Sequence, residues 1–131
     1  MKRLALVLAG LTALGGLAAV ASADDGDPAT VARGKSVFQH TCAPCHAAGP
    51  GIDGSPMLPG TAALAAKYQG KVPPVLEERG GLTVELLRYF VRHGSGAMPM
   101  FRKTEISDAE IAAVAAYLTA ASRAKPKPAS R

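Results

Sequence analysis

The chain of 131 residues contains no tryptophan and only two cysteines, and just 5% of its residues are aromatic. A zinc site would need more thiolates or a paired histidine beside these two cysteines. No segment alternates apolar and polar residues as a half-buried strand does, and no βαβ pattern surrounds the cysteines, so a thioredoxin-like dithiol is not favoured. The chain is therefore expected to be one small helical domain with few large apolar side chains for its core.

The formal net charge of +5 comes mainly from the two ends of the chain. Lys2 and Arg3 stand at the N-terminal end. At the other end, residues 122–131 form a tail rich in Lys, Pro, Ala and Ser that carries further basic side chains. No element has a basic stripe with interleaved aromatic residues, so nucleic-acid binding is not expected. The composition of the tail is typical of disorder, which makes it either a solvated end or a weak guide for an acidic partner.

Residues 1–23 have the pattern of a secretory signal peptide. The basic start is followed by an apolar run from Leu4 to Val20 and by the small residues Ala21-Ser22-Ala23. We expect cleavage after about Ala23 and export to the periplasm, with a retained anchor as the other possibility. The predicted organisation is a signal peptide at 1–23, one domain at 24–121 and a disordered tail at 122–131, with no stable membrane insertion.

Residues 42–46 are Cys-Ala-Pro-Cys-His, the attachment signature of a c-type haem. Cysteines three apart on a helix face the same way, so Cys42 and Cys45 can both form thioether bonds to one edge of a porphyrin. His46 follows directly and is the candidate proximal ligand of the iron. Covalent haem would also supply the large, flat apolar body that the side chains lack. A plain disulfide is the simplest other explanation of the two cysteines.

The rest of the domain is predicted to be helices separated by Gly/Pro loops. The first helix delivers Cys42, and a loop rich in glycine and proline follows from 47 to 60. Hydroxyl and carboxylate side chains mark the expected helix starts. These predicted N-caps are Asp27 before Pro28, Thr61 before a helix through Gln69, Thr83 before a helix that Gly94 ends, and Ser107, paired with Glu110, before a helix from Asp108 to about Ala121.

An iron bound by His46 has a sixth position to fill, for which the candidates are Met57, Met98, Met100, His40 and His93. Met98 stands out because it lies in a Gly-rich loop between two capped helices, where the backbone can approach a flat ring closely. Pro99 restricts the backbone beside its sulfur. Thioether ligation raises the haem potential and blocks small molecules, which suits an electron carrier.

The order of a haem-binding helix, a Gly/Pro loop, a Gly-x-x-x-Met-Pro-x-Phe segment and a last helix with Tyr117-Leu118 resembles a class I cytochrome c. The resemblance covers nearly the whole mature chain, residues 24–131. It implies an all-α fold of about four to five short helices around one covalently bound haem c. It also implies Met98 as the distal ligand, with Met100 as the alternative because the doublet departs from the family pattern.

The same resemblance assigns roles to residues outside the motif. In the family a proline carbonyl accepts the ring N–H of the proximal histidine, which makes Pro56 the candidate orienter of His46. Gly34 and Phe38 would meet Tyr117 where the first and last helices cross.

Three stretches, 67–73, 76–79 and 101–108, resemble the small cytochrome subunit of para-cresol methylhydroxylase-type flavocytochromes. In that family a flavoprotein oxidises para-alkylphenols at covalent FAD and passes single electrons to the cytochrome. This resemblance implies a flavoprotein dehydrogenase subunit as partner, and a soluble acceptor such as a small copper protein or another cytochrome. Lys67, Tyr68, Arg79 and Arg102 would then pair with haem propionates or with a partner surface.

The function expected from these features is one-electron transfer by a periplasmic mono-haem cytochrome that is not itself an enzyme. The main reading is the cytochrome subunit of a flavocytochrome. The alternative is a free-standing shuttle for another periplasmic dehydrogenase or oxidase. A haem peroxidase or sensor is less favoured, because it would need an open or labile sixth position on the iron.

Overall fold

The computed structural model describes residues 26–125, so the expected signal peptide and the end of the tail at 126–131 lie outside the described residues. Within this range the fold is all-α, as predicted, with one isolated bridge between Ser95 and Met98 in place of any strand. No helix in this range is long and apolar enough to cross a membrane. The elements in chain order are α1 (Pro28–Val37), η1 (Phe38–Cys42), α2 (Ala43–His46), α3 (Pro59–Tyr68), η2 (Leu76–Glu78), α4 (Val84–His93) and α5 (Asp108–Ala124).

The first helix begins where its capping residues predict. The Asp27 carboxylate accepts a hydrogen bond from the Thr30 backbone N–H at 2.9 Å, and Pro28 occupies the first turn. Beyond Val37 the helix widens into the π-helical segment η1, where the Ala43 N–H bonds back to the Phe38 carbonyl, five residues earlier. Such π-bulges occur frequently at functional sites, and this one leads directly into the cysteine motif.

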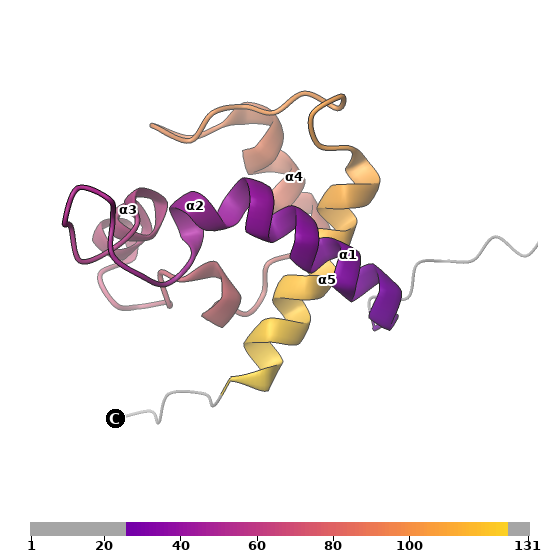
Figure 1. Ribbon diagram of the computed structural model, residues 1–131, viewed down its shortest axis with the longest axis horizontal. Coiled ribbons are helices and arrows are strands. Elements are labelled where there is room, and N and C mark those ends of the chain that lie inside the picture. The colour runs from indigo at the N-terminus through magenta and orange to yellow at the C-terminus, as the bar shows by residue number, and fades with distance from the viewer. Residues whose placement is uncertain (1–25, 126–131) are drawn as a thin grey trace, which may run out of the picture.

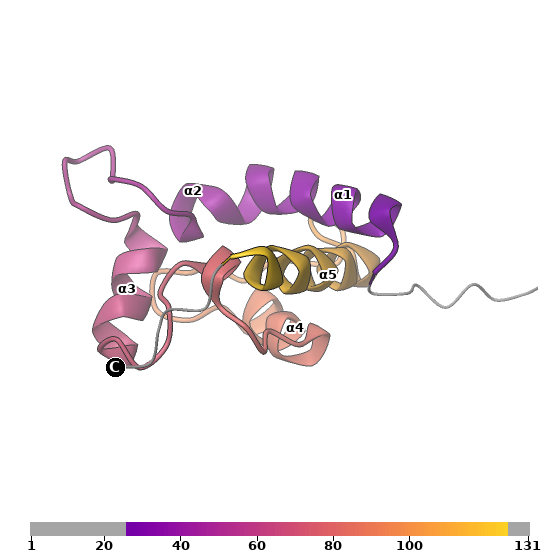
Figure 2. The same ribbon diagram turned by 90° about the horizontal axis from the view of Figure 1, so that it is seen from below.

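The core lies where α1 crosses α5. Figure 2 shows α5 between α1 on one side and α4 on the other. Gly34 is buried at the crossing, and the Phe38 and Tyr117 rings pack with their centroids 5.5 Å apart. The predicted meeting of Gly34 and Phe38 with Tyr117 is therefore confirmed. Leu118, which is fully buried, joins the same apolar cluster.

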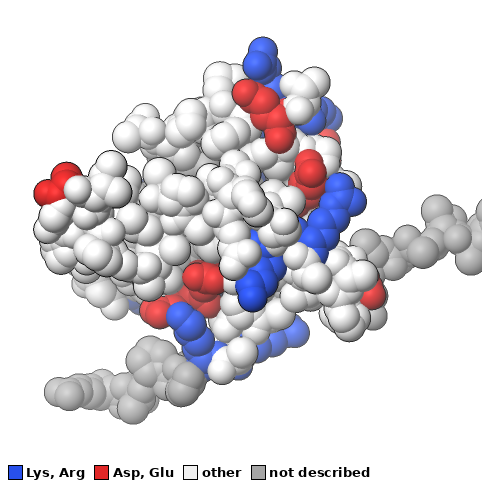
Figure 3. All heavy atoms as spheres, viewed as in Figure 1, with Lys and Arg blue, Asp and Glu red and all other residues white. Residues whose placement is uncertain are grey.

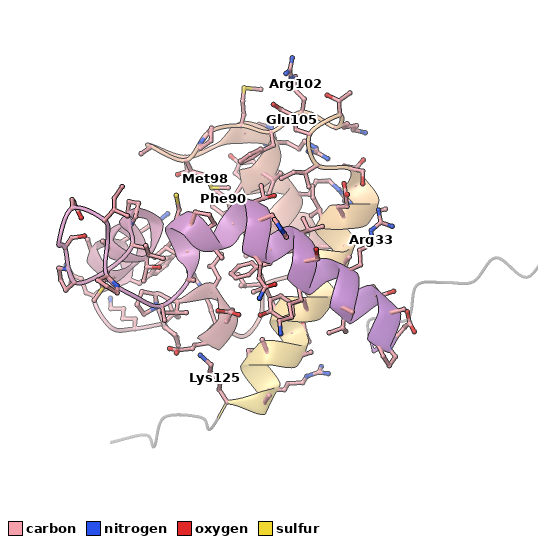
Figure 4. The ribbon with its side chains drawn as sticks, in the orientation of Figure 1. Arg33, Phe90, Met98, Arg102, Glu105 and Lys125 are labelled. Atoms are coloured by element: carbon pink, nitrogen blue, oxygen red, sulfur yellow. The ribbon has the colours of Figure 1, made fainter. Side chains whose placement is uncertain are left out.

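Helix α5 starts as predicted and ends later than predicted. Ser107 and Glu110 form the expected capping box at its start. Its end is Ala124, whereas the sequence suggested about Ala121 and a disordered tail from position 122. Just beyond this end Lys125, labelled in Figure 4, pairs with Glu78 of η2 at 2.9 Å.

Tyr117 ties the middle of α5 to η2. Its hydroxyl donates a hydrogen bond to the Glu77 carboxylate. Burial, followed by this bond, raises the pKa of Tyr117 to about 12. The contact fixes the loop that connects α3 to α4 against the last helix.

Helix α3 shows the clearest departure from the sequence prediction. Thr61 was expected to cap it, but the helix begins at Pro59 with Leu58 in the N-cap position and no side-chain capping bond. Proline is well suited to the first helical position because it has no N–H to leave unpaired. Thr61 therefore lies within the first turn, with its hydroxyl available for a contact outside the helix. By contrast, Thr83 caps α4 and Gly94 ends it, as predicted.

Candidate functional site

The two cysteines of the motif lie at the junction of η1 and α2. Cys42 is half-buried, Cys45 is exposed, and the two thiols are not joined in a disulfide. Burial, with the neighbouring Cys45 as a smaller cause, raises the pKa of Cys42 to about 11. Redox-active and nucleophilic dithiols instead depend on a lowered thiol pKa. Cys42 therefore lacks the lowered pKa of an activated thiol.

His46 is the last residue of α2 and is half-buried. Burial lowers the pKa of His46, which favours the neutral imidazole, the form that can donate a nitrogen lone pair to a metal. Its Nδ1 is buried and has no hydrogen-bond partner. A buried polar atom without a partner is unusual in a folded protein and is often associated with a bound group or with catalytic chemistry.

The N-terminus of α3 closes over the histidine. A Cβ at position 60 would lie 2.6 Å from Cε1 of His46 and 2.8 Å from its Nδ1, so only glycine fits there without displacing the ring. The Thr61 hydroxyl lies 2.9 Å from the Ala47 carbonyl oxygen and 3.4 Å from that of Cys45. Sequence reasoning missed both contacts, because Thr61 has the local pattern of a helix cap.

Pro56 lies in the exposed loop between α2 and α3. The hydrogen bond expected between its carbonyl and His46 is not formed, since His46 Nδ1 has no partner. The loop is instead organised around Ser55. Its hydroxyl donates to the Met57 carbonyl at 2.8 Å, and its carbonyl accepts from the Gly51 N–H at 2.9 Å. The orienting role of Pro56 remains a prediction.

The loop after α4 presents Met98. Ser95 and Met98 exchange two backbone hydrogen bonds of 3.0 Å, which closes a tight turn. Gly94 makes this turn possible: its φ is +69°, and a Cβ there would lie 2.6 Å from the Met98 carbonyl oxygen. In the view of Figure 4 the Met98 side chain points from the loop toward the part of the molecule that carries α2. Met98 is half-buried, whereas Met100 is 65% exposed.

Arg92 fastens the same loop to α4 and α5. Its guanidinium donates to the Phe101 carbonyl at 3.0 Å, to the Ile106 carbonyl at 2.8 Å and to the Asp108 carboxylate at 2.7 Å. A backbone bond of 2.8 Å from Phe101 to the Val91 carbonyl adds a further tie. No local sequence signal points to Arg92, because its partners lie 9 to 16 residues further along the chain.

The other candidate ligands are engaged elsewhere or exposed. His40 and His93 each hold a carbonyl of their own helix at 2.7 Å through Nδ1, and both are exposed. Met57 is 37% exposed. Across residues 26–125 no three His, Cys, Asp or Glu side chains gather into a metal site, so the zinc alternative lacks its ligands.

Comparison with known proteins places the chain in a family. Residues 29–118 match the family described as "Cytochrome C oxidase, cbb3-type, subunit III". The chain is similar to cytochrome c6 of Tetradesmus obliquus, with 40% identity over 90 residues that cover 69% of this chain and 89% of that protein. The chain is a class I c-type cytochrome. This cytochrome is also 38% identical to cytochrome c6 of Leptolyngbya boryana, over 69% of its own length and 91% of the relative's.

As a member of this family the cytochrome is an electron carrier with one covalently bound haem c, and not an enzyme. The residues present fit that group. Two unbridged thiols three residues apart, a half-buried imidazole and a half-buried thioether on a closed loop are the donor set that the cofactor requires. No flavoprotein is named in the descriptions of the relatives.

Proposed function

We propose that this cytochrome is a free-standing, one-electron shuttle of the periplasm. The observation that carries the proposal is the extent of the match. Cytochrome c6 proteins correspond to this chain over 88 to 91% of their own length in five of the seven relatives. The comparisons thus support the shuttle better than the flavocytochrome subunit that the sequence stretches suggested. A redox protein of the same compartment is the expected partner.

In this proposal Cys42 and Cys45 would attach the haem, and His46 and Met98 would ligate its iron. When bound, the haem supplies the one-electron ferric/ferrous couple. The chain contributes His46, whose neutral, ligating form is favoured because burial lowers its pKa. The backbone hydrogen bonds between Ser95 and Met98, and the bond from Arg92 to the Phe101 carbonyl, fix the loop that carries the Met98 thioether. A thioether held on the iron would exclude oxygen and peroxide from the sixth position.

The face over α2 is the proposed site of electron exit. Figure 3 shows the surface over α2 as uncharged, with acidic atoms at the outer edge of the loop that follows it and most Lys, Arg, Asp and Glu gathered elsewhere in this view. Cys45 is exposed there, so the attached edge of the ring would lie near solvent. An uncharged docking face gives weak electrostatic steering, and the association rate with a partner should depend only slightly on ionic strength.

Purification from the native host separates the shuttle from the subunit. The full-length tagged cytochrome is isolated at low and at moderate salt, and bound flavin is measured by absorbance and mass spectrometry. We expect a haem protein without stoichiometric flavin at both salt concentrations. A flavoprotein that co-elutes in equal amount would overturn the shuttle proposal and support the flavocytochrome subunit instead. The same sample gives the mature N-terminus, which we expect to be Asp24 if the signal peptide is cleaved in the periplasm.

The flavocytochrome subunit remains the second candidate because two of its matching stretches meet around Tyr68. Arg79 lies over the Tyr68 ring at 4.3 Å, and Lys67 lies 5.5 Å from the same ring. Such a cationic cluster could face an acidic partner surface. If a flavoprotein does co-elute, the double variant Lys67→Glu with Arg79→Glu should release it. The double variant Lys35→Glu with Arg123→Glu, at exposed positions of α1 and α5, makes the same change in net charge and serves as the control.

A further inference from the structure

Thr61 has an unusual position for a polar side chain. Its exposed fraction is 2%, and within residues 26–125 it is the one buried residue that is polar or charged. Its hydroxyl reaches out of α3 to the carbonyl oxygens of Ala47, at 2.9 Å, and Cys45, at 3.4 Å. These two carbonyls belong to the residues directly before and after His46.

The contact has a physical cause on each side. The last carbonyls of a helix have no partner within it, and α2 ends at His46. A hydroxyl carries one proton, so the shorter bond to Ala47 is the main one, with the Cys45 carbonyl as a weaker second acceptor. Thr61 lies in the first turn of α3, where its β-branched side chain has few rotamers, so the hydroxyl is held in place.

Gly60 completes the arrangement from the neighbouring position. The space that a Cβ would need at this position is taken by the His46 ring, at 2.6 Å from Cε1. The ring edge therefore packs directly on the α3 backbone. Gly60 limits where the His46 ring can lie, while Thr61 limits the backbone torsions of His46 itself.

We propose that Thr61 is a positioning residue for the proximal ligand. By bridging the carbonyls on either side of His46, it sets the direction in which the imidazole presents Nε2 to the iron. Groups that orient a metal-bound histidine tune the metal it binds, although they do not touch that metal. The proposal rests on haem ligation by His46 and is independent of whether the cytochrome acts as a shuttle or as a subunit.

The test compares two substitutions in the haem-loaded full chain. Thr61→Val keeps the shape of the side chain and removes the hydroxyl, whereas Thr61→Ser keeps the hydroxyl. We expect Thr61→Val to change the ferric-to-ferrous ratio at a fixed applied potential by about threefold or more, and to alter the paramagnetic NMR shifts of the His46 ring. Thr61→Ser should restore both toward the wild-type values.

A stability control separates positioning from general loosening. Thr83→Ala removes the cap of α4, whose hydroxyl bonds the Leu86 N–H at 3.2 Å, and should lower the unfolding temperature without moving the potential or the His46 shifts. Equal potentials in Thr61→Val, Thr61→Ser and wild type would overturn the proposal. So would a shift in Thr83→Ala as large as that in Thr61→Val.

The wild-type protein provides a readout that does not depend on the folding of a variant. A Thr61 hydroxyl bonded to the Ala47 carbonyl should give a separate, slowly exchanging proton resonance in the reduced cytochrome. A hydroxyl proton that exchanges with water as fast as those of exposed threonines would contradict the proposal, even if Thr61→Val fails to take up haem.

Discussion

The carbonyl oxygen of Ala113 occupies the space that a side chain at Gly34 would need. A Cβ at position 34 would lie 1.9 Å from that oxygen and 3.0 Å from the Cβ of Tyr117. The backbones of α1 and α5 therefore touch at their crossing (Figure 1). Because α1 continues through η1 into the Cys42–His46 motif, this contact also determines where the attachment site lies relative to the last helix.

Replacing Gly34 should be one of the most damaging single-methyl changes in this protein. Gly34→Ala forces α1 away from α5, and overpacking of this kind costs about 1–3 kcal/mol or more in the free energy of unfolding. The measurement is a guanidinium titration of the haem-loaded protein. Gly80→Ala is the matched control, because a Cβ there meets nothing within 4 Å, and it should change stability by less than about 1 kcal/mol. Similar losses in both variants would show that the helix crossing is not the cause.

The proposed role of Met98 as an iron ligand can be tested against Met100 as the alternative. We expect Met98→Leu to lower the reduction potential and to let carbon monoxide bind the reduced protein at neutral pH, because the thioether ligand is lost. Met100→Leu should leave both properties near wild type, since Met100 is 65% exposed while Met98 is half-buried and paired with Ser95. Carbon monoxide binding in Met100→Leu alone would reverse the assignment.

The ion pair between Arg92 and Asp108 should make the stability of the fold depend on pH in the acid range. Hydrogen bonds from Arg92 first, and then from Lys103, lower the pKa of Asp108 from 3.8 to about 2. A carboxylate with a lowered pKa contributes stability above its ordinary pKa, and that contribution is lost as pH falls from about 3.8 to about 2. Wild type should therefore be more stable than Asp108→Asn at neutral pH, with the gap closing across this range in urea titrations. A gap that does not change with pH would exclude the ionised carboxylate as its source.

An alkaline limit is expected from Tyr117. Its pKa of about 12 in the folded state, against an ordinary value of 10.0, favours the protonated phenol. The resulting stability is present below about pH 10 and is lost as pH rises toward about 12. Thermal unfolding should show a steeper loss across this range in wild type than in Tyr117→Phe. Tyr89→Phe, at an exposed position of α4, leaves the same number of tyrosines as Tyr117→Phe does and should behave like wild type.

Much of this cytochrome could be predicted from short stretches of its sequence. The caps at Asp27, Thr83 and Ser107 are confirmed, because each side chain bonds a backbone N–H three residues later in the chain. The spacing of Cys42, Cys45 and His46 predicts covalent haem for the same reason: one turn of helix is a local structure. The family resemblance then anticipated the crossing of Gly34 with Tyr117.

Other features depend on residues that are distant in the chain, and the tertiary structure alone decided them. Thr61 has a cap's local pattern, yet its hydroxyl bonds Ala47, 14 residues earlier. Arg92 reaches Asp108 on another helix, and Lys125 pairs with Glu78, 47 residues earlier. A local pattern specifies which hydrogen bonds a segment can make within a few residues. Which group meets an unpaired carbonyl or carboxylate elsewhere is settled only when the helices pack.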